Sequence, residues 1–107
     1  MHAALLQINP TVGALRSNAD LIIQEAHRAA DAGAELLITP ECALSGYPPE
    51  DLILKDHFCA DCQNELDRLI NELPKEPLIL IGTPLLRNGK KHNAAIAIQN
   101  GTIVGEY

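Results

Sequence analysis

The segment HAALLQINPTVGALRSNADLIIQEAHRAADAGAELLIT, residues 2–39, decides the fold class of this chain. It opens with an apolar run over residues 2–8 and closes with a second apolar run over residues 35–39. Strand, helix and strand with short joins predict a βαβ unit, with parallel strands and a right-handed crossover. The helix is predicted over residues 15–32, ended by Gly33, because apolar residues recur there at steps of three and four. These residues are Leu15, Ala19, Ile22, Ile23, Ala26, Ala29 and Ala30.

The remainder of the chain predicts one more helix, a third buried strand and two hairpins. A second apolar stripe runs over residues 62–73, and Pro74 ends it. LILIG, residues 78–82, has the short apolar pattern of a buried strand. Asn88-Gly89 and Asn100-Gly101 each lie between strand-like segments, and Asn-Gly favours a two-residue type I′ hairpin turn. We therefore expect an α/β fold that starts as βαβ and continues as antiparallel hairpin strands.

The predicted elements leave one face of the sheet without cover. Buried parallel strands need helices on both faces, and only two helices are predicted. The last predicted strand also runs to the final residue, Tyr107. We expect residues 1–107 to be the truncated N-terminal portion of a larger domain.

Composition and charge exclude several classes of partner. The 107 residues are 47% hydrophobic and carry a formal net charge of −6, which argues against nucleic acid because phosphate binding needs clustered Lys and Arg. The cationic cluster Arg87, Lys90 and Lys91 brackets a predicted turn, as a solvated hairpin tip would. No segment approaches the roughly 18–20 apolar residues of a membrane-spanning helix, and no signal peptide is evident. Three cysteines without disulfide-framework spacing fit a reducing compartment, so we expect a cytoplasmic protein.

Glu41 is the strongest candidate for a catalytic residue. In open α/β sheets, ligands bind in the crevice outside the carboxyl ends of the strands. Glu41 comes two residues after the strand predicted over residues 35–39, so its carboxylate is expected near that crevice. A carboxylate there can act as a general base. The alternative is a surface acid that happens to follow a strand.

The loop SGYPPEDL, residues 45–52, favours the catalytic alternative. Pro48 and Pro49 fix their own φ angles and restrict the residues before them, so the loop holds Tyr47 in a defined place. Pro49 can also begin a short helix, with Asp51 near its positive end. A simple connector would not need two prolines, whereas the wall of a pocket would.

The cysteines and histidines form a weaker set of candidates. His57, Cys59 and Cys62, with His92 further along, could hold zinc, but one C-x2-C pair supplies only two of the four usual ligands. Buried structural cysteines are the alternative, and we expect no metal. Nucleophilic catalysis is not expected either, because Cys42 adjoins a carboxylate and the other two cysteines lie on a predicted helix. Glycine-rich nucleotide-binding motifs are absent from the sequence.

Three segments together resemble the N-terminal part of a carbon–nitrogen hydrolase (nitrilase-superfamily) domain. They are QINPTVGALRSN (7–18), LLITPECALSGYPPEDL (36–52) and GTPLLRNGKKHNAAIAIQNGTIVGEY (82–107). Within that superfamily, GYPPEDL (46–52) is similar to the glutaminase domain of glutamine-dependent NAD synthetases. The resemblance implies an αββα sandwich, of which residues 1–107 would be an incomplete part.

The resemblance also implies roles for single residues. A Glu–Lys–Cys triad would hydrolyse an amide through a thioester, and Glu41 matches the glutamate that acts as its general base. The lysine and the nucleophilic cysteine are expected beyond Tyr107, so residues 1–107 alone are expected to be inactive. Tyr47 matches the wall that binds substrate, with the Pro48–Asp51 loop beside it. Asn93 matches an asparagine that supports the site from behind.

For a complete enzyme of this kind, the resemblance implies that glutamine is hydrolysed and that its ammonia passes to a separate synthetase domain. That domain would use ATP and Mg²⁺ to amidate nicotinic acid adenine dinucleotide to NAD, in a homo-oligomer. No cofactor is expected within residues 1–107. Two alternatives stay open: another amidase of the superfamily, or an α/β interaction module without chemistry.

Overall fold

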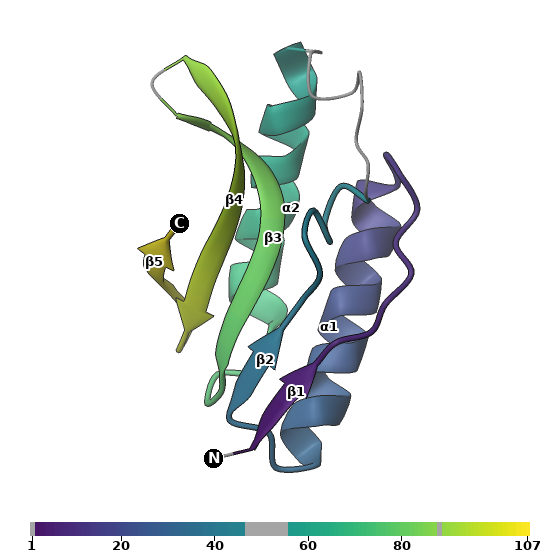
Figure 1. Ribbon diagram of the computed structural model, residues 1–107, viewed down its shortest axis with the longest axis vertical. Coiled ribbons are helices and arrows are strands. Elements are labelled where there is room, and N and C mark those ends of the chain that lie inside the picture. The colour runs from purple at the N-terminus through teal and green to yellow at the C-terminus, as the bar shows by residue number, and fades with distance from the viewer. Residues whose placement is uncertain (1, 47–55, 88) are drawn as a thin grey trace.

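Figure 1 shows a computed structural model of the chain, which describes residues 2–46, 56–87 and 89–107. Its elements, in chain order, are β1 (Ala3–Leu5), α1 (Leu15–Asp31), β2 (Leu36–Ile38), α2 (Asp56–Glu72), β3 (Leu78–Arg87), β4 (Lys90–Gln99) and β5 (Thr102–Glu106). The strands form one sheet in the order β1-β2-β3-β4-β5. The first three strands pair in parallel and the last three pair antiparallel. The predicted α/β fold, with a βαβ start and hairpin strands after it, is confirmed.

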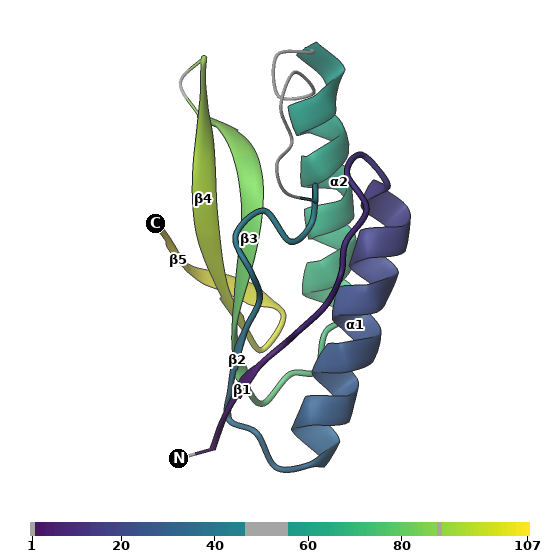
Figure 2. The same ribbon diagram turned by 45° about the vertical axis from the view of Figure 1, so that its right-hand side comes forward.

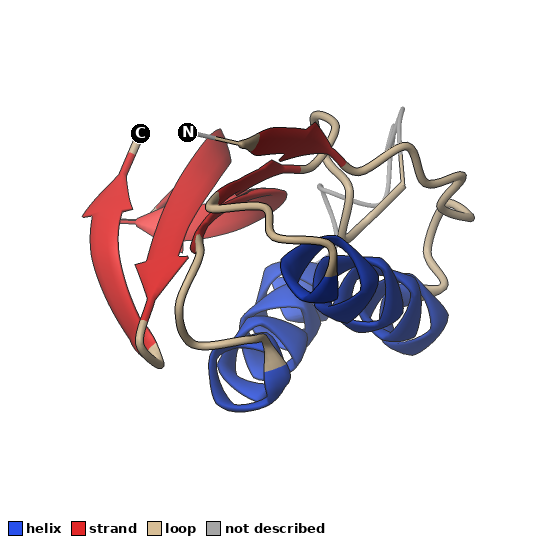
Figure 3. Ribbon diagram, turned by 90° about the horizontal axis from the view of Figure 1, so that it is seen from below, coloured by secondary structure: helices blue, strands red, loops and turns tan. Residues whose placement is uncertain are grey.

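Both helices lie on the same face of the sheet (Figures 2 and 3). Their apolar stripes pack against strand residues that alternate along β2, β3 and β4, as expected for side chains on one face of a sheet. The fully buried core includes Ile22, Leu37, Leu66, Leu69, Ile79, Ile81 and Ile96. Within the described ranges, no helix covers the opposite face, and Leu5 on the edge strand β1 is 69% exposed. The uneven cover predicted from the sequence is therefore present.

The helices end where the sequence predicted. After α1, Gly33 has a φ of +95°, a left-handed conformation that glycine adopts without steric cost. At the end of α2, the Lys75 ammonium donates hydrogen bonds to the carbonyl oxygens of Ile70 and Asn71. Neither helix is long and apolar enough to cross a membrane, in the part of the chain that the structure describes.

Two strands differ in length from their predictions. β1 is shorter than residues 2–8, because its partner β2 ends at Ile38, opposite Leu5. β3 is longer than residues 78–82 and continues through Pro84, which lacks the N–H of an ordinary ladder residue. The pairing of β2 with β3 ends at Leu80, and beyond that point β4 is the only strand that pairs with β3 among the described residues. Proline is tolerated at such an edge position.

The second hairpin turn has the predicted geometry. Asn100 and Gly101 have φ angles of 54° and 70°, and Gln99 pairs with Thr102 on either side of them. Two consecutive positive φ angles define a type I′ turn. In the first hairpin, Arg87 pairs with Lys90, as a two-residue connection requires.

Candidate active site

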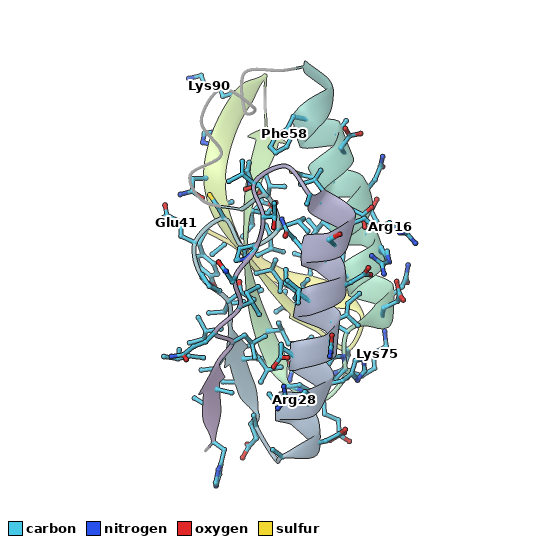
Figure 4. The ribbon with its side chains drawn as sticks, turned by 90° about the vertical axis from the view of Figure 1, so that its right-hand side faces the viewer. Arg16, Arg28, Glu41, Phe58, Lys75 and Lys90 are labelled. Atoms are coloured by element: carbon cyan, nitrogen blue, oxygen red, sulfur yellow. The ribbon has the colours of Figure 1, made fainter. Side chains whose placement is uncertain are left out.

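Glu41 lies just past the carboxyl end of β2, as the sequence predicted. Figure 4 shows its side chain on the side of the molecule away from α1. The side chain is exposed and borders a hollow of about 300 Å³. The hollow is lined by Thr39, Pro40, Glu41, Gly82, Asn93, Ala94, Ala95 and Tyr107. An acid in a concave, partly apolar site at a strand end can serve as a proton acceptor.

Asn93 is the residue that contacts the Glu41 carboxylate. It lies near the start of β4, paired with Pro84 of β3, and its Nδ2 donates a hydrogen bond to Glu41 Oε1. The amide holds one carboxylate oxygen, and the carboxylate keeps further lone pairs that can accept a proton. The structure thus brings together Glu41 and Asn93, two of the residues singled out from the sequence, from segments 52 residues apart.

Cys42 completes a chain of three polar side chains. It is only 2% exposed, and its Sγ donates to Asn93 Oδ1 over 3.2 Å. Its backbone adopts a φ of 51°, in the left-handed region that residues other than glycine seldom occupy. From the sequence, Cys42 was expected not to be a nucleophile, and no local pattern predicts its contact with Asn93.

The segment after Glu41 is held against β3 by a close backbone contact at Gly82. A Cβ built on Gly82 would lie 2.5 Å from the Pro40 carbonyl oxygen and 2.8 Å from the Cys42 nitrogen. The Gly82 amide donates to Thr39 Oγ1 over 3.0 Å, and its carbonyl accepts from the Leu44 amide over 3.2 Å. These contacts fix the direction in which the chain leaves β2.

On its other side, the same segment is fixed to the start of α1 by Asn18. This side chain is fully buried; its Nδ2 donates to the carbonyl oxygens of Thr11 and Leu44, and its Oδ1 accepts from the Thr11 amide. The amide of Gly13 also donates to the Ser45 carbonyl oxygen over 2.9 Å. Sequence reasoning missed Asn18. The available signal was a polar residue on the apolar stripe of α1, one position before Ala19.

Burial raises the pKa of the Cys42 thiol; the Glu41 charge acts in the same direction, and a hydrogen bond with Ser45 opposes it. The folded chain therefore holds this proton more tightly than the unfolded chain does. Stability from this group is complete below the ordinary thiol pKa of 9.0 and is lost as the pH rises above it.

We expect the free energy of unfolding to fall more steeply above pH 9.0 in the wild type than in Cys42→Ala. The other ionisable groups titrate alike in both proteins, so the difference between the two slopes isolates the thiol. Urea unfolding followed by circular dichroism, at neutral pH and above pH 9.0, measures it. Equal slopes in the two proteins would contradict a raised pKa for the Cys42 thiol in the folded chain.

The other candidates are placed less completely. Tyr47, Pro48 and Asp51, predicted to shape the pocket, lie outside the described residues, as does Pro49. Cys62 is buried in the core on α2, whereas His92 is exposed on β4. His57 and Cys59 belong to α2, but their side chains are not described. Among the described residues, no group of three or more His, Cys, Asp or Glu could hold a metal ion.

A larger cavity lies at the other end of the molecule. It has a volume of about 710 Å³ and is formed by the end of α1, the segment between α2 and β3, and the start of β3. The charged groups at its rim include Asp31, Glu35, Lys75 and Glu76, and the Lys75 ammonium is already bonded to helix carbonyls. The smaller hollow at Glu41 is the better candidate, because it contains an acid whose orientation is fixed by a side-chain amide.

Comparison with known proteins identifies the family of this chain. A family model for carbon–nitrogen hydrolase matches residues 2–107. The chain is 43% identical to the glutamine-dependent NAD(+) synthetase of Synechocystis sp., over 94% of its length and 19% of the relative. It is 35% identical to the synthetase of the same name from Xanthomonas campestris, over 100% of its length and 19% of the relative. The chain thus spans about a fifth of the length of the curated relatives it matches.

Solved structures agree with the sequence matches. The glutamine-dependent NAD+ synthetase from Acinetobacter baumannii, solved in complex with ADP, superposes with a TM-score of 0.90 at 28% identity, over 98% of this chain and 20% of that one. A nitrilase-superfamily amidase from Nesterenkonia shares the fold, with a TM-score of 0.82 at 24% identity over all of this chain and 42% of that one. The predicted partial nitrilase-like fold and the resemblance to glutamine-dependent NAD synthetases are both confirmed. With a family model spanning residues 2–107 and an acid held at the strand end, this chain belongs to the carbon–nitrogen hydrolase family.

Proposed function

We propose that residues 1–107 form the N-terminal part of the glutaminase domain of a glutamine-dependent NAD synthetase, and that Glu41 is its general base. The observation that carries this proposal is the Glu41 carboxylate, held by Asn93 at the carboxyl end of β2. The similarity to synthetases from several bacteria supports the choice of enzyme within the family.

In this proposal, the chain supplies a proton acceptor and the surface around it. Glu41 takes the proton of the nucleophile that attacks the glutamine amide, and Asn93 keeps the carboxylate turned toward the hollow. Tyr47, Pro48 and Asp51, from outside the described residues, would form the wall against which glutamine binds. The lysine and the nucleophilic cysteine of the triad would come from sequence that follows Tyr107 in a longer protein.

The ammonia released from glutamine would pass to a synthetase domain outside residues 1–107. There, ATP with Mg²⁺ would drive amidation of nicotinic acid adenine dinucleotide to NAD. A cytoplasmic location and a homo-oligomeric assembly belong to the same proposal. The ammonia transfer, the use of ATP with Mg²⁺, the location and the assembly are all inferred from the resemblance to whole synthetases.

A second candidate function is hydrolysis of another amide by an enzyme of the same family. The fold shared with the nitrilase-superfamily amidase from Nesterenkonia favours it. A module without chemistry is the third candidate, and the fixed orientation of Glu41 weighs against it. A surface acid without a role would not need a dedicated amide partner.

We expect a purified polypeptide of residues 1–107 to release no glutamate from glutamine above background. A base without a nucleophile cannot form the covalent intermediate of amide transfer. Glutamate release, measured with a coupled dehydrogenase, tests this, with the Glu41→Ala variant as the control. Turnover that the Glu41→Ala change removes would contradict the proposal that the lysine and the nucleophilic cysteine lie outside residues 1–107.

The gene that encodes these residues offers an independent test. A following K-x-x-L-P-like strand and then a cysteine would support a carbon–nitrogen hydrolase domain. A later pyrophosphate-binding loop of the S-G-G-x-D-S type would favour NAD synthesis over the simpler amidase. A stop codon directly after Tyr107 would favour the module and overturn the proposal.

A further inference from the structure

Glu41, Asn93 and Cys42 are joined in series by two hydrogen bonds. Asn93 Nδ2 donates to Glu41 Oε1, and the Cys42 thiol donates to Asn93 Oδ1. We propose that Cys42 is a positioning residue for Glu41, because its thiol fixes the orientation of the Asn93 amide. The catalytic consequence of this inference rests on the proposed role of Glu41 as the general base.

The chemistry of an amide explains why a third residue is needed. The oxygen and nitrogen ends of Asn93 are nearly equal in size, so packing alone does not choose between its two flipped orientations. An ionised carboxylate has only acceptors, so it is held only when the nitrogen end faces it. A donor opposite the oxygen end removes the ambiguity, and the Cys42 thiol is that donor. With the amide reversed, both contacts would be lost.

The thiol is itself held in place by the backbone. Cys42 is 2% exposed, and its carbonyl oxygen accepts from the Gly46 amide over 2.8 Å and from the Ser45 hydroxyl over 3.3 Å. The left-handed φ of 51° sets the direction of its Cα–Cβ bond. Burial raises the pKa of this thiol, which keeps it protonated and able to donate at neutral pH. Cys42 therefore acts as a fixed donor and not as a nucleophile.

Cys42 follows Glu41 directly in the chain, so one side chain can contact both residues. Glu41 borders the hollow, its neighbour Cys42 is buried, and a single amide from β4 contacts both. The tight approach of Gly82 to the nitrogen of Cys42 keeps the two residues at a fixed distance from the sheet. Motion of the carboxylate relative to the sheet must break one of these contacts.

The Asn93 side-chain amide reports this arrangement directly by NMR. In the wild-type chain of 107 residues, we expect the Nδ2 proton that faces Glu41 to resonate well downfield of its geminal partner. Asn64, an exposed asparagine on α2, provides the reference for an amide in solvent. Two Asn93 protons that resemble those of Asn64 would overturn the inference, whether or not any variant folds.

Matched variants then test the role of the thiol. Cys42→Ala removes the donor and should speed exchange of the Asn93 Nδ2 protons with water about fivefold, the loss expected for one ordinary hydrogen bond. Cys42→Ser retains a donor and should stay close to the wild-type rate. Cys62→Ala removes a second buried thiol, from the core on α2, and should leave the rate unchanged. Exchange that is unchanged in Cys42→Ala, or equally fast in Cys62→Ala, would overturn the inference.

A kinetic measurement separates this inference from the proposed function. In the full-length protein that we propose contains these residues, Cys42→Ala should lower kcat for glutamine hydrolysis about fivefold at unchanged KM, and Cys42→Ser should restore it. A change in KM alone would overturn the positioning role. Suppose that glutamine hydrolysis stays intact in Glu41→Gln while the wild-type protein shows the downfield Asn93 proton and Cys42→Ala speeds its exchange. In that case the proposed function fails and the contact between Cys42 and Asn93 stands.

Discussion

Replacing Glu41 with glutamine should lower glutamine hydrolysis by the full-length protein about 10²–10⁴-fold, the usual effect of losing a general base. The side chain keeps its size, and its remaining oxygen can still accept from Asn93 Nδ2, so the site should keep its shape. What is lost is the negatively charged oxygen that takes a proton. The rate of glutamate release under saturating glutamine measures the effect.

Two controls make this result specific. Glu35→Gln changes an exposed acid at the opposite end of β2 and should leave the rate unchanged. Free ammonia supplied to Glu41→Gln should restore NAD formation, because the proposed synthetase step needs ammonia and not glutamine itself. Glutamine hydrolysis near the wild-type rate in Glu41→Gln would remove Glu41 from the mechanism. Failure of ammonia to restore NAD formation would instead contradict the proposed division of labour between the two domains.

Much of the fold could be predicted because its periodic patterns are local. The steps of three and four in α1 and the short apolar runs of β2 and β3 need only near neighbours in sequence. The Asn100-Gly101 turn was also predictable, because few residues accept two positive φ angles in succession. The length of β3 was not, because Pro84 is compatible with a strand only where β2 has already ended.

The site itself could be predicted only in part. The Asn88-Gly89 turn implies that Arg87 pairs with Lys90, and counting back from it places Asn93 opposite Pro84. The same count does not reveal that the chain after β2 folds over Gly82 and brings Glu41 to Asn93. That path depends on the absence of a side chain at Gly82 and on a left-handed Cys42. A glycine inside a strand allows another backbone to come close but does not say which one, and the left-handed Cys42 has no local sequence signal. Tertiary contacts of this kind determine where a predicted acid can act.

The importance of that path leads to a prediction for Gly82→Ala. The added methyl group would lie 2.5 Å from the Pro40 oxygen and 2.8 Å from the Cys42 nitrogen, both of them backbone atoms that cannot rotate away. The chain after β2 must therefore shift, and the Leu44 and Thr39 contacts with Gly82 must stretch. We expect the free energy of unfolding to fall by about 3 kcal/mol, at the upper end for overpacking in a closely packed site. Urea unfolding followed by circular dichroism measures it.

Gly105→Ala is the matched control, because it makes the same change in another strand of the sheet. The atoms nearest to its new methyl group would belong to the Tyr107 side chain, at 3.0 Å, and this exposed side chain can move aside. Alanine also loses less conformational entropy than glycine on folding, so Gly105→Ala should be close to neutral. Equal losses in the two variants would mean that glycine is needed throughout the sheet and that Gly82 has no special contact with the Glu41 segment. A large loss in Gly82→Ala alone, with displaced Asn93 side-chain amide resonances, would tie the close backbone approach to the placement of the base.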